Sequence, residues 1–178
     1  MAARLGPCRV TFAPRLETTS RAALASRWTE TNGQFEIAVA TDGVSHHDLA
    51  LELLLCLGQA LWERTILGER EAYWKLLGEE IEAGVTGEID EQALREKRQL
   101  LASLTAARSM RRFERYARSS FAGTAAEYIH ALWHDVTIRS GPEHLPASWL
   151  RRRLELLARW FPPGAGYRLF SRVRKSSG

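Results

Sequence analysis

Cysteine is scarce in this chain, and other sequence signals of common functions are also missing. Cys8 and Cys56 are the only two cysteines, and they show no metal-ligand spacing, so the sequence argues against a disulfide framework and a cysteine zinc site. There is no phosphate-cradling glycine loop, no nucleophile elbow and no internal repeat. The sequence therefore does not support glycine-loop phosphate binding or serine-nucleophile catalysis.

A membrane span and a secretory leader are not predicted either. The longest apolar stretch, around residues 49–57, contains Glu52 and is shorter than the roughly 20 apolar residues that a span needs. Residues 1–7 lack a long apolar core and a cleavage pattern. We expect a soluble, cytoplasmic protein without a membrane partner.

The length and the apolar content predict one domain. The chain has 178 residues and is 45% hydrophobic, and a chain of this size buries roughly 70% of its unfolded surface without staples. We expect residues 1–43 to form a small sheet with one helix, residues 44–170 to form the helical part, and residues 171–178 to fray.

The first 40 residues predict a small, largely antiparallel sheet. Residues 8–12 form a short candidate strand, and residues 17–28 have helical content. Asn32-Gly33 stands between two extended segments, residues 27–31 and 34–40. Asn-Gly favours the positive φ angles of a two-residue turn, so this pair predicts a β-hairpin.

A buried central helix is predicted to follow this sheet. Ser45 and Asp48 stand three residues apart, which is the spacing of a capping box at the helix start. From Leu49 to Trp62 the segment is apolar on nearly every side, with Glu52 among the few polar interruptions. A helix that is apolar all round is buried, so we expect the other elements to pack around it.

Further helices are predicted along the rest of the chain. They cover residues 69–82, then 91 to about 118 with a cap at Asp90 and a break near 105–109. Thr124 and Glu127 form a second capping-box pattern, which predicts a helix over 124–138, and the last helix spans 147–161. The fold class is therefore α+β and mostly helical, with the small sheet packed on the central helix.

Charge is unevenly distributed along the chain. Residues 1–94 carry 8 basic and 15 acidic side chains, a formal charge of −7, whereas residues 95–178 carry 17 basic and 6 acidic side chains, +11. We favour the interpretation that the two halves attract each other and that arginines cover the outer faces of helices. The alternative is a basic face for nucleic acid or an acidic partner, built from Arg108, Arg111, Arg112, Arg115, Arg118 and 151–153.

Histidines and a glutamate form a candidate metal site. His130 and His134 are four residues apart on one helix face, and Glu127 precedes them on the same face. With His46 or His47 from the central helix, such a set could hold zinc and activate water. The alternative is structural: Glu127 caps its own helix, and the two histidines line a core edge.

The order of these elements resembles the zincin metallopeptidases of the glutamate-ligand type. In that family, H-E-x-x-H on the active-site helix supplies two zinc histidines and the general base, and a downstream helix supplies a glutamate ligand. The resemblance implies that His47 is the first zinc histidine, Asp48 the base and Glu127 the third ligand. Leu51 stands where the second histidine belongs, so the resemblance implies the fold more than the activity.

Three hypotheses of function follow from these patterns. The leading one is a degenerate zincin-like protein without peptidase activity, which acts by binding or assembly. The second is a metal-dependent hydrolase with a His/Glu site between two helices, in which His130 or His134 replaces the missing ligand and Asp48 or Glu52 is the base. The third is a binder of nucleic acid or of an acidic partner. The first two require the start of the central helix to lie against Glu127.

Overall fold

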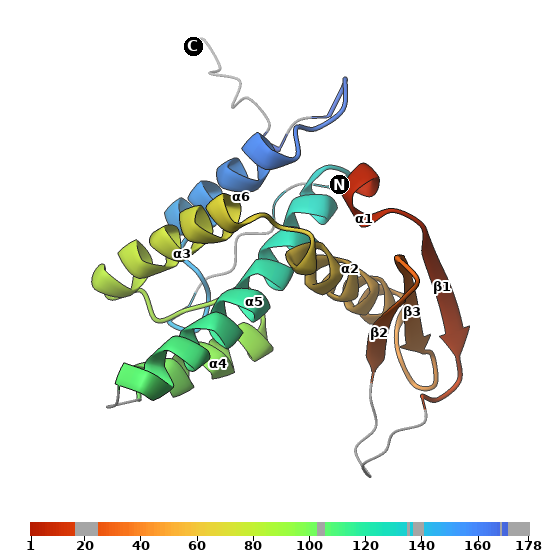
Figure 1. Cartoon of the computed structure of the whole chain (residues 1–178), viewed down its shortest axis with the longest axis horizontal. Coiled ribbons are helices and arrows are strands. Elements are labelled where there is room, and N and C mark those ends of the chain that lie inside the picture. Colours follow the sequence, from red (N-terminus) through yellow and green to blue (C-terminus); the bar gives the residue numbers. More distant parts are fainter. Residues whose placement is uncertain (17–24, 103–105, 135, 137–140, 168, 171–178) are drawn as a thin grey trace, which may run out of the picture.

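The computed structural model confirms an α+β, mostly helical fold (Figure 1). It describes residues 1–16, 25–102, 106–134, 136, 141–167 and 169–170, with the side chains of 106–109 excepted. A small sheet lies on one side, and α2 lies between it and the helices α3 to α6. The elements are α1 (Ala2–Leu5), β1 (Cys8–Ala13), β2 (Ser26–Thr31), β3 (Gln34–Ala40), α2 (His46–Glu63), α3 (Leu67–Glu82), α4 (Glu91–Leu101), α5 (Ala106–Ala131) and α6 (Ala147–Trp160).

The sheet is mixed, with β3 between the two edge strands. β2 and β3 pair antiparallel across the Asn32-Gly33 turn, where both residues have positive φ angles of 53° and 75°, as predicted. β1 pairs with the other edge of β3 and runs parallel to it, which the sequence did not indicate. The predicted helix over 17–28 is wrong at Ser26–Trp28, which belongs to β2, while residues 17–24 lie outside the described part.

Helix α2 begins as predicted but is buried unevenly. The Ser45 hydroxyl accepts a hydrogen bond from the Asp48 backbone N–H, at 3.1 Å. The inward residues of β3 pack against α2, and the buried residues of the helix all lie between Cys56 and Trp62. Leu51, in the first half, is 41% exposed. The second half of α2 is therefore the more deeply buried half. In the first half, Leu49 and Leu53 pack against the sheet, whereas the face that carries Leu51 remains accessible.

The prediction of a capping box at Thr124 and Glu127 is wrong. Helix α5 runs without interruption through both positions and ends at Ala131. The Thr124 hydroxyl donates to the carbonyl of Ser120 one turn earlier, which is a mid-helix arrangement. Residues 124–131 of the predicted 124–138 helix therefore belong to the second half of α5, and the described residues 132–134 and 136 are not helical. The predicted break at 105–109 is wrong for 106–109, which are helical: α4 ends at Leu101 and α5 begins at Ala106, and residues 103–105 lie outside the described part.

Small residues bring α2 and α5 close together. A side-chain Cβ at Gly58 would lie 2.6 Å from the carbonyl oxygen of Ala122, so glycine is required at this crossing. Ala122, Ala125 and Ala126 continue the small surface of α5 and are buried. This close approach sets the first turns of α2 beside the C-terminal half of α5. None of the helices in the described part is long and apolar enough to cross a membrane.

Candidate functional site

A groove of about 710 Å³ lies where α2, α4 and α5 meet. The first turns of α2 form one wall, and the start of α4 with residues 88–90 forms another. The C-terminal half of α5 and the segment that leads into α6 complete it. Apolar side chains make up much of its surface, namely Leu51, Leu54, Leu55, Ile89, Leu145 and Leu150.

Four of the five predicted site residues line this groove. His47 and Asp48 come from α2, and Glu127 and His130 come from α5. The expected proximity of the start of α2 to Glu127 is therefore present. His134 is exposed and outside the groove lining, where its ring stacks on that of His130 with the centroids 4.9 Å apart.

Asp48 is occupied by the start of its own helix. The Ser45 hydroxyl donates to Asp48 Oδ2 at 2.7 Å and also accepts from the Asp48 backbone N–H. This reciprocal pair holds the carboxylate at the helix N-terminus, where the helix dipole favours a negative charge. The predicted role of Asp48 as a base thus competes with a capping role that the structure shows.

The donor set does not fit a zinc ion. Within the residues that the structure describes, no group of three or more histidine, cysteine, aspartate or glutamate side chains is placed to hold a metal. His47, Glu127 and His130 share the groove, and Leu51, four residues after His47 on α2, lines it without a metal-donor atom. A tetrahedral site needs three protein ligands converging on one point.

The charge of the groove is strongly negative. Five carboxylates line it besides the deeply buried Glu88, and Arg95 is the one arginine or lysine among the described lining residues, so the formal charge is −4 with neutral histidines. Low-dielectric walls concentrate such a field and favour cationic ligands. The five carboxylates belong to Asp48, Glu52, Asp90, Glu91 and Glu127.

Asp90 combines a capping role with an unused acceptor. Its Oδ1 accepts from the Ala93 backbone N–H at 2.9 Å, which confirms the predicted N-cap of α4. Its Oδ2 is buried and has no hydrogen-bond partner among the described residues. A Cβ at Gly123 of α5 would lie 2.2 Å from this oxygen, so the glycine makes room for it. Burial raises the pKa of Asp90 above its ordinary value.

Backbone pairing holds the wall between α4 and α6 in place. The Glu88 N–H donates to the carbonyl of Glu143 at 3.0 Å, and the Leu145 N–H donates to the carbonyl of Glu88 at 3.1 Å. A Cβ at Gly87 would lie 2.1 Å from the His144 carbonyl oxygen, so the two segments touch directly. This pairing places Ile89 and Leu145 in the groove wall.

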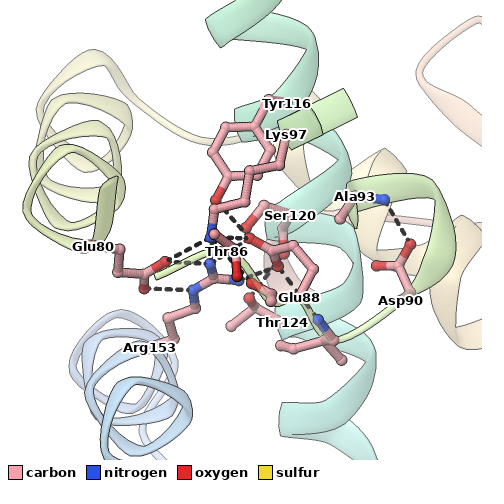
Figure 2. Close-up of polar contacts among 12 residues, drawn as sticks. Glu80, Thr86, Glu88, Asp90, Ala93, Lys97, Tyr116, Ser120, Thr124 and Arg153 are labelled. Carbon is pink, nitrogen blue, oxygen red and sulfur yellow. Dashed lines mark hydrogen bonds and ion pairs between the residues drawn. The ribbon is translucent and has the colours of Figure 1, made fainter. Parts of the chain in front are cut away.

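Beneath this wall, four charged side chains are almost completely buried (Figure 2). Arg153 of α6 binds both carboxylates of the cluster, with Nε 2.8 Å from Glu80 Oε1 and Nη1 2.8 Å from Glu88 Oε2. Lys97 Nζ donates to the Gly87 carbonyl at 3.0 Å and to Glu88 Oε1 at 3.3 Å. The Tyr116 hydroxyl also donates to Glu88. Two cations balance two anions, so the cluster is formally neutral.

This cluster is a structural connection and was missed by sequence reasoning. It joins α3, the 87–89 segment, α4, α5 and α6, and its charged groups are all hydrogen-bonded or ion-paired. A signal did exist, because Arg153 lies between Leu150, Leu154 and Leu157 on the apolar stripe of α6. An arginine in such a stripe is buried only with a partner, and the sequence does not identify the partner.

Most arginines of the basic segments are already engaged. Arg118 of α5 pairs with Glu63 at 2.8 Å, and Arg115 lies 3.4 Å from Glu96. Arg152 of α6 pairs with Glu79 of α3. The Arg118–Glu63 and Arg152–Glu79 pairs join the two halves and agree with the interpretation that these halves attract each other, whereas Arg115 and Glu96 both lie in the basic half. All three contacts reduce the charge available to a phosphate backbone.

Comparisons with protein-family models, with curated proteins and with solved structures give no match to this chain. What can be assigned therefore depends on the fold and on the groove. The fold is α+β with a mixed three-stranded sheet, and the groove combines apolar side chains with carboxylates, of which the exposed Asp48 and Glu91 form its acidic rim.

Proposed function

We propose that this chain is a zincin-like protein without peptidase activity, which binds a partner in the groove between α2, α4 and α5. One observation carries the proposal. His47, Asp48 and Glu127 line a single groove, as the zincin resemblance requires, and Leu51 lines it where the second zinc histidine belongs. On this proposal, the groove corresponds to an active site whose set of metal ligands is incomplete.

The same residues argue against retained peptidase chemistry. Leucine has no donor atom for a metal, and Asp48 is held by the Ser45 hydroxyl at the helix start. A zinc-bound water would need three protein ligands and a base with room to accept a proton. The described lining residues do not provide this arrangement.

The size and chemistry of the groove support a binding role. A volume of about 710 Å³ lies within the roughly 300–1,000 Å³ typical of ligand sites. Its apolar side chains favour burial of a partner's apolar groups, while its carboxylates favour a cationic partner. A partner that is both basic and apolar fits these features best.

Metal analysis of the purified chain tests this proposal. We expect far less than one zinc per chain after dialysis, and no cleavage of a mixed peptide library. Leu51→His places an imidazole four residues after His47, on the same helix face, and should produce zinc binding in calorimetry that the parent chain lacks. Leu51→Ser is the matched control, because it removes the leucine without adding a ligand.

A metal-dependent hydrolase would require His47, Glu127 and His130, which line one groove, to converge on one ion, and the described residues do not show this arrangement. Stoichiometric zinc in the parent chain, lost on His130→Ala, would favour this hydrolase and contradict a purely binding role. If Leu51→His binds no more zinc than Leu51→Ser, the correspondence with the zincin helix is refuted.

A further inference from the structure

The surface of this chain carries a patch whose chemistry complements the groove. It lies where α4 ends and α5 begins, and we call it the basic tip: Arg98, Leu101, Met110 and Arg111. Leu101 is 49% exposed and Met110 is 70% exposed, so two large apolar side chains face solvent there. Exposed apolar groups beside cations are what an apolar groove with an acidic rim is suited to bind.

The arginines of the basic tip are not engaged within the described part of the chain. Neighbouring Arg112 donates to the Gln99 carbonyl at 2.7 Å, and Arg115 lies near Glu96. Arg98 and Arg111 are exposed and form no ion pair with another described residue. The basic tip therefore presents two guanidinium groups that can neutralise carboxylates elsewhere.

A copy of the chain cannot place this tip in its own groove. The groove contacts α4 at its first turns and α5 from Gly123 to His130, whereas the basic tip lies at the opposite ends of both helices. At about 1.5 Å per residue, Met110 is roughly 20 Å along α5 from Gly123. α4 and α5 pack side by side and are joined by the Lys97–Glu88–Tyr116 contacts, so this separation is rigid.

We propose that the chain associates with itself head to tail, with the basic tip of one copy in the acidic groove of the next. This rests on the proposed function, and it identifies a second copy of the chain as the partner. Arg98 and Arg111 meet the carboxylates of the rim, and Leu101 and Met110 cover the apolar surface that includes Leu51. Because the two surfaces differ, the contact is heterologous and leaves a free tip and a free groove at the ends.

Sedimentation velocity of the full chain tests the proposal. At about 0.05 M salt, the sedimentation coefficient should rise with protein concentration beyond that of a dimer, because each added copy exposes another groove. At about 1 M salt, where the Debye length is roughly 3 Å, association should weaken at least tenfold. A chain that stays monomeric at low salt and high concentration overturns the proposal.

Charge reversal identifies the two surfaces. Arg111→Glu alters the tip, Glu91→Arg alters the groove, and each alone should weaken self-association at least tenfold. An equimolar mixture of the two variants should associate again, because the altered groove copy still has a basic tip and the altered tip copy still has an acidic groove. Glu71→Arg, on exposed α3 surface outside the groove, is the matched control and should associate like the parent.

The outcomes separate this proposal from the function on which it rests. Circular dichroism and thermal unfolding of every variant first establish that the fold is retained. Equal weakening by Glu71→Arg, or no recovery in the mixture, overturns the head-to-tail contact. If the chain stays monomeric but binds a labelled ten-residue lysine–leucine peptide, and the Glu91→Arg variant binds this peptide more weakly, then self-association is wrong while the groove function stands.

Discussion

Removing Arg153 is the most informative perturbation of this fold. Arg153→Met keeps the length of the side chain but leaves Glu80 and Glu88 buried with Lys97 as their one remaining nearby cation. Breaking a buried ion pair from one side typically costs about 3–5 kcal/mol. For a chain of this length, the melting temperature should fall by roughly 6–20 °C.

The neighbouring arginine provides a matched control. Arg152 of α6 pairs with Glu79 of α3 in the same way, but this ion pair is exposed. Arg152→Met should therefore lower the free energy of unfolding by about 1 kcal/mol or less. Arg153→Lys should lie between the two, because it keeps the charge and loses the two-pronged contacts. Urea denaturation of the three variants gives the comparison.

The pH dependence of stability provides an independent check. Burial by itself would raise the pKa of Glu88, but Arg153, Lys97 and the Tyr116 hydrogen bond outweigh burial and lower it from 4.5 to about 2. A carboxyl group with a lowered folded pKa stabilises the fold above its unfolded pKa and loses this contribution as pH falls toward the folded value. As pH falls from roughly 5 to 2, protonation of Glu88 should lower the free energy of unfolding by about 3 kcal/mol. Arg153→Met should make this pH dependence smaller.

Two results would refute this reasoning. One is an Arg153→Met variant whose free energy of unfolding lies within about 1 kcal/mol of the Arg152→Met variant. The other is an acid transition that Arg153→Met leaves unchanged. Either would mean that the buried cluster contributes little net stability and that packing alone joins α3, α4 and α6.

Two further predictions concern the groove wall and the helix crossing. Asp90→Asn keeps the N-cap acceptor and should change the free energy of unfolding by less than about 1 kcal/mol, yet weaken binding of basic peptides in a fluorescence titration. Asp90→Ala should also lose about 1 kcal/mol of stability, because it removes the N-cap acceptor. If the two variants lose the same stability, the capping role of Oδ1 and the groove role of Oδ2 are not separate. Gly58→Ala should destabilise the fold by about 1–3 kcal/mol, because its Cβ would lie 2.6 Å from the Ala122 carbonyl oxygen. Gly78→Ala, with open space at its Cβ, should raise stability by about 0.5–1 kcal/mol in thermal unfolding. If Gly58→Ala and Gly78→Ala lower stability equally, the close crossing of α2 and α5 is refuted.

Local signals predicted the starts of several elements correctly. The Asn32-Gly33 turn and the caps at Ser45 and Asp90 depend on contacts within three residues, so neighbouring sequence contains the information. The same pattern failed at Thr124, where the chain is already helical. There the buried α5 surface packs on α2, and the Thr124 hydroxyl also bonds the Tyr73 hydroxyl, 51 residues away. Tertiary packing outweighed a local cap that is worth only about 1 kcal/mol.

The candidate site divides in the same way. Sequence alone determined that His47, Asp48 and Glu127 belong to helices that could meet, and that Leu51 breaks the zinc pattern. Only the tertiary structure decided that one face of the first half of α2 stays accessible, because Leu49 and Leu53 pack on the sheet whereas Leu51 remains 41% exposed. The tertiary structure also decided which carboxylates surround the first half of α2. It pairs Arg153 with Glu80 and Glu88, which are 73 and 65 residues away in the sequence. Hydrophobic periodicity states how much of a helix is apolar, whereas the partners that cover it are set by contacts between distant segments.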